Sequence, residues 1–174
     1  MRYLKIPLDR VGVLIGPQGD TKKYIEEHTH VSLDIDSEVG EICIDDHASE
    51  DPLMIFKVEH IVRAIGRGFS PEHAFRLFSD EVDFYLFDIH EYVGKKPSHV
   101  KRLKSRVIGS EGKTKRVLEE LTQANISVYG HTIAVIADIF FMDIVKKAID
   151  MLLSGSKHAT VYRYVERSMK QLRR

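Results

Sequence analysis

The sequence predicts an α+β chain that contains two copies of one module. Residues 15–23 match residues 108–116 without a gap, and in both segments two glycines bracket two other residues. Each segment is followed by two short runs of alternating apolar residues, which is the pattern of a hairpin, and then by a strongly apolar helical pattern. One short motif is weak evidence, but two copies in the same context indicate an internal duplication.

The first copy is expected to begin with a strand over residues 3–8, in which Pro7 indicates an edge position. Asp9 can cap a short apolar helix that runs to Ile15, directly before the glycine turn. A helix, a hairpin and a long apolar helix follow, and Ser70-Pro71 opens one more helix. The helix, hairpin and long helix cover residues 20–28, 31–35 with 41–44, and 52–66.

The second copy repeats this order with more basic residues. A strand-like run at residues 82–89 precedes a basic helix that leads into the second glycine turn. A helix, a second hairpin, a buried helix and a basic C-terminal helix with interleaved tyrosines are expected after the turn. The last three cover residues 125–129 with 132–136, 139–153 and 158–174. We therefore expect two domains, residues 1–80 and residues 81–174.

The net charge of zero hides a strong asymmetry between the two halves. Residues 95–174 hold 17 Lys and Arg against 7 Asp and Glu, whereas residues 1–94 hold 9 against 19. The basic half can attract a polyanion such as RNA, and the acidic half would repel one. The alternative explanation is that the two halves attract each other.

The composition also restricts the class of protein. No apolar run approaches the ~20 residues of a membrane-spanning helix, and the N-terminus lacks the apolar core of a targeting peptide. Cys43 is the only cysteine, which excludes an internal disulfide and favours a reducing compartment. Its place in an alternating run predicts a small core residue. We therefore expect a cytoplasmic protein.

The turn between Gly109 and Gly112 is the strongest candidate for a binding site. Glycine lets the backbone approach a ligand, and the helix after the turn begins with free N–H groups and a positive dipole end, which favour a phosphate. Residues 109–114 also resemble the end of a nucleotide-triphosphate loop, but Val107 stands where that loop needs a glycine. We therefore interpret the turn as a contact for a nucleic-acid backbone.

The expected RNA-binding residues gather around this turn and the hairpin that follows it. Val107 and Ile108 would give the bases an apolar floor, although the same pattern also fits core residues. Cations beside the turn would hold phosphates, and backbone groups near Ser127 would read base edges. The full set in the second copy is Lys104, Arg106, Val107, Ile108, Gly109, Ser110, Glu111, Gly112, Lys113, Thr114, Arg116, Ser127, Val128, Tyr129 and Arg163. The first copy offers a weaker set, Ile15, Gly16, Pro17, Gln18, Gly19, Lys22 and Lys23, with the acidic Asp20 beside it.

The order of strand, helix, Gly-x-x-Gly turn, helix, two strands and helix resembles the KH domain of the eukaryotic type (type I), and both copies share it. The resemblance implies that each copy forms a three-stranded antiparallel sheet packed on three helices, with an extra helix after it. It also implies that a copy clamps about four nucleotides of single-stranded RNA. Both turns depart from the family pattern, since neither Pro17-Gln18 nor Ser110-Glu111 supplies a basic residue between the glycines.

The pairing of an acidic first copy with a basic second copy, and the ending at residues 154–164, resemble the Partner of Nob One (Dim-Two) family of ribosome-assembly factors in its short archaeal form. This resemblance implies binding near the 3′ end of 16S-type small-subunit rRNA and assistance in its processing. It also implies work beside the Nob endonuclease. No cofactor is implied.

Two other classes of function stay open. The acidic first copy could dock a basic partner protein, and the chain would then be an interaction adaptor or a translation-linked regulator in which only the second copy binds RNA. A metal-dependent nuclease is the other class, suggested by Asp34, Asp36, Asp45 and Asp46, but alternation places such carboxylates on a solvated strand face. The histidines show no zinc-site spacing. We therefore expect no catalytic residue and no metal site.

Overall fold

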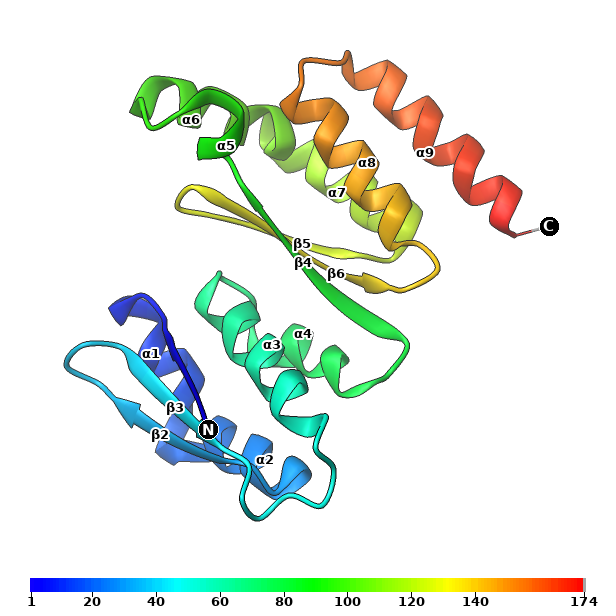
Figure 1. Cartoon of the computed structure of the whole chain (residues 1–174). Coiled ribbons are helices and arrows are strands. Elements are labelled where there is room, and N and C mark those ends of the chain that lie inside the picture. The colour runs from blue at the N-terminus through cyan, green and yellow to red at the C-terminus, as the bar shows by residue number, and fades with distance from the viewer. Residues whose placement is uncertain (174) are drawn as a thin grey trace. The chain divides into compact units, whose positions relative to one another are not determined.

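The computed structural model describes residues 1–173 and divides the chain into two compact units (Figure 1). The first unit runs from Met1 to Phe78, and the second begins at Ser79. Each unit repeats the order of strand, helix, glycine turn, helix, two strands and helix, and each contains a three-stranded antiparallel sheet. The predicted α+β class with two such sheets is confirmed.

The sheet of the first unit has the strand order β1-β3-β2. The elements of this unit are β1 (Arg2–Lys5), α1 (Leu8–Ile15), η1 (Pro17–Gly19), α2 (Asp20–Thr29), β2 (Ser32–Asp36), β3 (Glu41–Asp45), α3 (Met54–Gly66), α4 (Pro71–Ala74) and η2 (Phe75–Phe78). Leu33, Ile42 and Ile44 are buried because alternate strand residues point to the same face. Cys43 points to the other face and is only half-buried, so the predicted core position is wrong.

The sheet of the second unit has the equivalent order β4-β6-β5. The elements of this unit are β4 (Val82–Asp88), α5 (His90–Val93), α6 (Pro97–Ile108), η3 (Ser110–Gly112), α7 (Lys113–Thr122), β5 (Asn125–Tyr129), β6 (Thr132–Asp138), α8 (Met142–Leu153) and α9 (His158–Leu172). α9 packs on α7 and α8 and buries Val161, Val165 and Met169 at helical spacing. In the described part of the chain, no helix has both the length and the apolar character needed to cross a membrane.

The two units repeat individual side-chain contacts as well as elements. Thr29 and Thr122 each donate a hydrogen bond to the carbonyl four residues earlier, at 2.7 and 2.6 Å, and accept the N–H two residues later at 3.2 Å. Glu26 and Glu119 each accept the N–H seven residues later at 3.0 Å. These contacts tie the second helix of each unit to its hairpin, and their repetition supports the inferred duplication.

Several element boundaries differ from the prediction. Asp9 does not cap α1, because the helix already begins at Leu8 with Pro7 at its N-cap. α5 was not predicted, since four residues are too short to show a helical period. α8 begins at Met142 rather than at residue 139, because the Asp138 carboxylate accepts the N–H of residue 140 at 2.9 Å and turns the chain.

Candidate nucleic-acid interface

Both glycine turns join two helices through backbone angles that few residues adopt. In the second turn φ is +76° at Gly109, +54° at Glu111 and +75° at Gly112, and the first turn repeats these angles closely. A Cβ disfavours positive φ, so glycine at two of the three positions lowers the strain. The carbonyl of Gly109 accepts the N–H of Gly112 at 3.2 Å and closes the turn.

The two glycines are needed for different physical reasons. A Cβ on Gly109 would lie 2.2 Å from the hydroxyl oxygen of Thr114 and 2.7 Å from its backbone nitrogen, so α7 leaves no space there. A Cβ on Gly112 would meet no atom within 4 Å. Gly109 therefore allows the turn to pack on α7, whereas Gly112 leaves the backbone open to a ligand.

The N-terminus of α7 points its positive dipole end at this open backbone. The helix begins at Lys113, and no side chain caps its first N–H groups. Lys113 and Arg116 are exposed, whereas Lys115 pairs with Glu119 at 3.2 Å. The turn therefore offers backbone donors and two exposed cations to a phosphate.

An apolar hollow of about 590 Å³ lies between α5 and α6. It is lined by His90, Lys95, Pro97, Val100, Lys101, Lys104, Ser105 and Ile108. α6 also contacts β5, one of the two edge strands of the sheet, on which Ser127, Val128 and Tyr129 are half-buried. Lys104 and Ile108 therefore lie together at a surface that has both apolar area and positive charge. A groove that binds bases beside a phosphate backbone needs both features.

Val107 and Arg106 make internal contacts that the sequence did not predict. Val107 is 0% exposed and belongs to the core cluster, so it offers no floor to bases. The Arg106 guanidinium donates from Nε to the Leu152 carbonyl at 2.7 Å, and from a terminal nitrogen to the Ser156 carbonyl. It therefore satisfies carbonyls at the end of α8.

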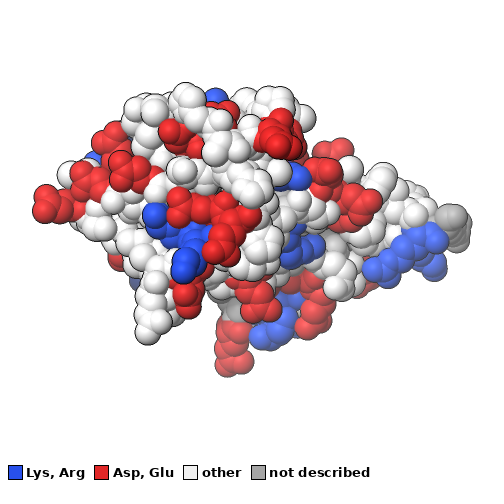
Figure 2. Space-filling view, turned by 90° about the horizontal axis from the view of Figure 1, so that it is seen from below, with Lys and Arg blue, Asp and Glu red and all other residues white. Residues whose placement is uncertain are grey.

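The remaining predicted residues are placed less favourably. Arg163 is exposed on α9 and lines neither the apolar hollow nor the glycine turn. Lys22 of the first copy pairs with Glu26 at 3.2 Å, and α2 begins with Asp20 where α7 begins with Lys113. Lys115 of the second copy makes the same pair as Lys22, and Lys23 is exposed like its equivalent Arg116. The first turn therefore has the backbone geometry of the second but carries an acidic residue in place of Lys113. Space-filling Figure 2 shows Asp and Glu side chains spread over much of the face that it draws.

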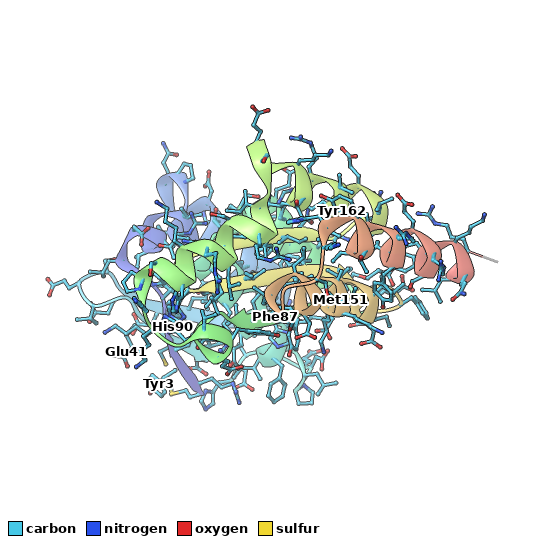
Figure 3. All side chains as sticks on the ribbon, turned by 90° about the horizontal axis from the view of Figure 1, so that it is seen from above. Tyr3, Glu41, Phe87, His90, Met151 and Tyr162 are labelled. Atoms are coloured by element: carbon cyan, nitrogen blue, oxygen red, sulfur yellow. The ribbon has the colours of Figure 1, made fainter. Side chains whose placement is uncertain are left out.

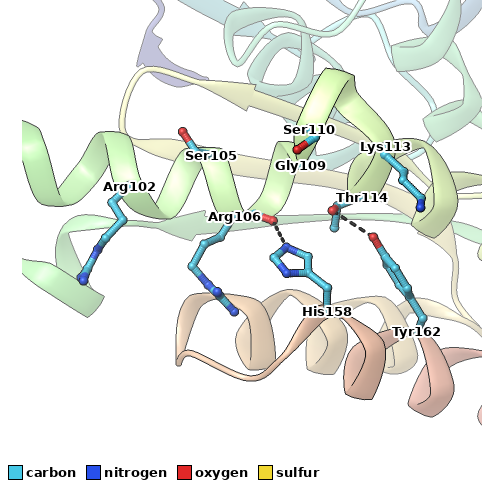
Figure 4. A pocket seen from close by; sticks show the side chains of 9 residues that line it. All are labelled: Arg102, Ser105, Arg106, Gly109, Ser110, Lys113, Thr114, His158 and Tyr162. Carbon is cyan, nitrogen blue, oxygen red and sulfur yellow. Dashed lines mark hydrogen bonds between the residues drawn. The ribbon is translucent and has the colours of Figure 1, made fainter.

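A second pocket, of about 620 Å³, lies between the glycine turn and α9, and the sequence did not predict it (Figure 4). Arg102, Ser105, His158 and Tyr162 line it together with residues that were predicted, Arg106, Gly109, Ser110, Lys113 and Thr114. His158 Nε2 lies 2.9 Å from the Arg106 carbonyl, and the hydroxyls of Thr114 and Tyr162 are 3.0 Å apart. Figure 3 shows Tyr162 at the junction of α9 with the helices of the turn. No sequence pattern links α9 to the turn.

Among residues 1–173, one group of three side chains has the composition of a metal site: Asp88, His90 and His131, whose ligand atoms lie within 4.8 Å of one another. His131 Nδ1 is 2.9 Å from the Asp88 carboxylate, and the two imidazoles stack with an interplanar angle of 9°. Nitrogen lone pairs lie in the ring planes, so two parallel stacked rings do not aim at one ion. Burial raises the pKa of Asp88, but hydrogen bonds from His131 and the His90 N–H outweigh it and hold this pKa below its ordinary value. The cluster in this arrangement is a hydrogen-bonded network.

Two family models match the chain. The model described as eukaryotic type KH-domain (KH-domain type I) matches residues 83–170, and the model described as KH domain matches residues 1–68. A KH domain-containing protein of Methanocaldococcus jannaschii is 47% identical over 174 residues, which are 100% of this chain and 76% of that protein.

Two solved structures are similar over nearly the whole chain. Dim2p from Pyrococcus horikoshii OT3 has a TM-score of 0.87 and 44% identity, and the match covers 95% of this chain and 98% of that one. A chain in the a/eIF2alpha-aDim2p-rRNA complex from the same organism has a TM-score of 0.90 and 44% identity, and the match covers 98% of this chain and 94% of that one.

Proposed function

Because the chain belongs to the tandem KH-domain family that includes archaeal Dim2p, we propose that it is a non-catalytic protein that binds single-stranded RNA through its second KH domain. The observation that carries this proposal is the open backbone at Gly112 beside the uncapped start of α7, with Lys113 and Arg116 exposed. The apolar hollow at Ile108 and the edge strand β5 supply the surface for the bases.

The repeat supplies a matched pair of variants for the test. Gly112→Asp and Gly19→Asp place the same side chain at equivalent positions with φ of +75° and +78°, and neither Cβ meets an atom within 4 Å. The two variants therefore carry the same backbone strain. We expect Gly112→Asp to weaken binding about tenfold or more, which equals ~1.4 kcal/mol, whereas Gly19→Asp leaves it unchanged. The measurement is fluorescence anisotropy of the full chain with a labelled single-stranded RNA of about twelve nucleotides, a length that exceeds the ~4 nucleotides of one KH groove.

The RNA target is proposed to be the 3′ region of 16S-type small-subunit rRNA, and the role to be assembly and assistance in processing of that end in the cytoplasm. The presence of rRNA in the complex of the similar Dim2p supports this target. An oligonucleotide with the 3′-terminal rRNA sequence should bind more tightly than a scrambled one of the same length. Equal affinity for the two sequences would contradict the target while leaving RNA binding itself intact.

A second function, docking of a partner protein, is proposed for the first domain. A hollow of about 610 Å³ on its sheet is lined by Asp34, Asp36, Glu38 and Glu41, together with Tyr3, Ile35, Ser37 and Cys43. Such an acidic surface suits a protein with a basic surface, and candidates are the Nob endonuclease or a translation factor, since the similar Dim2p is seen with a/eIF2alpha. The double change Asp34→Asn, Asp36→Asn should weaken partner binding in a pull-down with either purified candidate and leave RNA affinity unchanged.

A further inference from the structure

The pocket between the glycine turn and α9 has the chemistry of an anion site. None of its nine lining residues is Asp or Glu, and three are Lys or Arg. The side chains of Arg102 and Lys113 are exposed, and neither forms an ion pair or hydrogen bond with a residue between 1 and 173. Their positive charge is therefore not neutralised by the described part of the protein.

Backbone and side-chain donors add to these cations. α7 and α9 both begin at this pocket, at Lys113 and His158, and no side chain caps either helix. Since a carbonyl oxygen can only accept, His158 Nε2 donates to the Arg106 carbonyl and fixes the ring at the pocket wall (Figure 4). The guanidinium of Arg106 is held by carbonyls and positions this wall.

The first copy shows that folding of the turn does not require these cations. In the gap-free alignment Asp9 stands at the position of Arg102, and Asp20 at the position of Lys113. The two turns nevertheless have nearly the same backbone angles. The turn therefore folds with either sign of charge at these two positions. The positive charges of Arg102 and Lys113 instead affect what the pocket of the second copy can bind.

We propose that this pocket binds a backbone phosphate of the RNA strand after the strand has crossed the glycine turn, with Arg102 and Lys113 as its ligands. This inference rests on the proposed function and extends it. Ser105 lines both this pocket and the apolar hollow, so the two adjoin across α6. A strand whose bases lie in the apolar hollow and whose backbone passes over Gly112 brings its next phosphate to this pocket. The RNA site thus continues past the groove onto α9.

The test compares Arg102→Gln with Lys170→Gln in the full chain. Both variants remove one positive charge from an exposed side chain, but Lys170 lies near the end of α9 and does not line the pocket. The probes are single-stranded RNAs of about twelve nucleotides with the 3′-terminal small-subunit rRNA sequence, in which one phosphate at a time is replaced by an uncharged methylphosphonate. Binding is measured by anisotropy at several salt concentrations.

Arg102→Gln should weaken binding about three- to tenfold and lower the slope of log K against log salt by about 0.7, the value for one contacted phosphate on a single strand. One methylphosphonate that weakens binding by the wild type should have no effect on Arg102→Gln, because the two changes remove the same contact. Lys170→Gln should keep the full effect of every methylphosphonate.

The two hypotheses fail in different ways. If the wild type binds RNA and Gly112→Asp weakens this binding as expected, but Arg102→Gln behaves like Lys170→Gln, the pocket proposal is overturned and the RNA groove stands. The pocket proposal is also overturned if every methylphosphonate keeps its effect in Arg102→Gln. A wild type that binds no single-stranded RNA would refute the proposed function as well.

Discussion

Alanine at Gly109 and alanine at Gly112 should have very different effects on the stability of the second domain. At Gly109 the angles are φ +76° and ψ +173°, a region that is occupied almost only by glycine. At Gly112 they are +75° and +14°, the left-handed helical region, where a Cβ costs about 1–2 kcal/mol. The two positions are three residues apart, so the comparison holds the surroundings nearly constant.

The structure allows both magnitudes to be worked out. Alanine at Gly112 touches nothing, and the lower entropy of its unfolded chain offsets about 0.4–1 kcal/mol of the strain, which leaves a net loss of about 0.5–1 kcal/mol. Alanine at Gly109 adds strain of about 1–3 kcal/mol and a clash with the backbone nitrogen of Thr114, which cannot rotate away. Movement of Thr114 also disturbs its hydrogen bond to Tyr162, worth about 1 kcal/mol. We expect a total loss of about 3–5 kcal/mol at Gly109.

Thermal unfolding of the full chain can measure these losses. The chain contains no tryptophan, so far-ultraviolet circular dichroism and calorimetry are the suitable signals. For a domain of this size, 1 kcal/mol shifts the Tm by about 4–8 °C. The transition of the second domain should therefore fall by about 2–8 °C in Gly112→Ala and by at least ~12 °C in Gly109→Ala.

The first domain provides an independent repetition. A Cβ on Gly16 would lie 2.3 Å from the hydroxyl oxygen of Thr21, whereas a Cβ on Gly19 meets nothing within 4 Å. Gly16→Ala should therefore destabilise the first domain much more than Gly19→Ala does. Equal Tm losses at the two glycines of either turn would refute the explanation by steric contact. The substitution Thr114→Ala should rescue Gly109→Ala only in part, because the clash with the backbone nitrogen persists.

Three further outcomes follow from buried contacts. Arg106→Lys should lower the free energy of unfolding by about 1–2 kcal/mol, because an ammonium cannot replace the forked contact with two carbonyls. A urea titration measures this loss, and an unchanged unfolding midpoint would contradict it. Thr122→Val should cost about 1–3 kcal/mol in the same assay, since the Ala124 N–H loses its acceptor; Ser at this position should retain most of the stability. Burial raises the pKa of Glu59, but the contacts with Arg2 and Arg63 outweigh burial and hold this pKa below its ordinary value of 4.5. The stabilisation of the first domain by ionised Glu59 is therefore present above about pH 4.5 and is lost as the pH falls through the lower pKa of Glu59 in the folded state. Glu59→Gln should remove this part of the acid sensitivity of the first domain in pH-dependent thermal melts.

The repeated elements were predictable because they are encoded locally. Periodicity and the glycine spacing indicate helix, turn, helix and hairpin within each copy, and the gap-free match of Thr29 with Thr122 reflects a contact that spans only four residues. Arg106 could not be placed in this way, because its guanidinium binds carbonyls that lie 46 and 50 residues later. The contact of His131 with Asp88, which joins residues 43 apart, likewise depends on the register of β4 with β6.

The surface proposed to bind RNA was predictable only in part. Glycine and charge patterns located the turn and Lys113, but a helical period does not distinguish Val107, which is fully buried, from Ile108, which lines the apolar hollow. Both residues stand next to each other at the end of α6. Their different exposure depends on the packing of α6 against the sheet and α8, which no local pattern contains.

Gly16 packs against Thr21 almost as closely as Gly109 packs against Thr114, so a side chain at either glycine would clash with the threonine. After a gene segment is duplicated, selection for folding alone can preserve the first glycine and the threonine of a copy that has lost its ligand. The presence of this glycine and threonine in a copy therefore shows that the turn must fold, and does not show that the copy binds a ligand. Folding does not constrain the charges at Asp9 and Asp20, which are reversed at the equivalent Arg102 and Lys113, so these two positions are the better indicators of whether a copy binds nucleic acid.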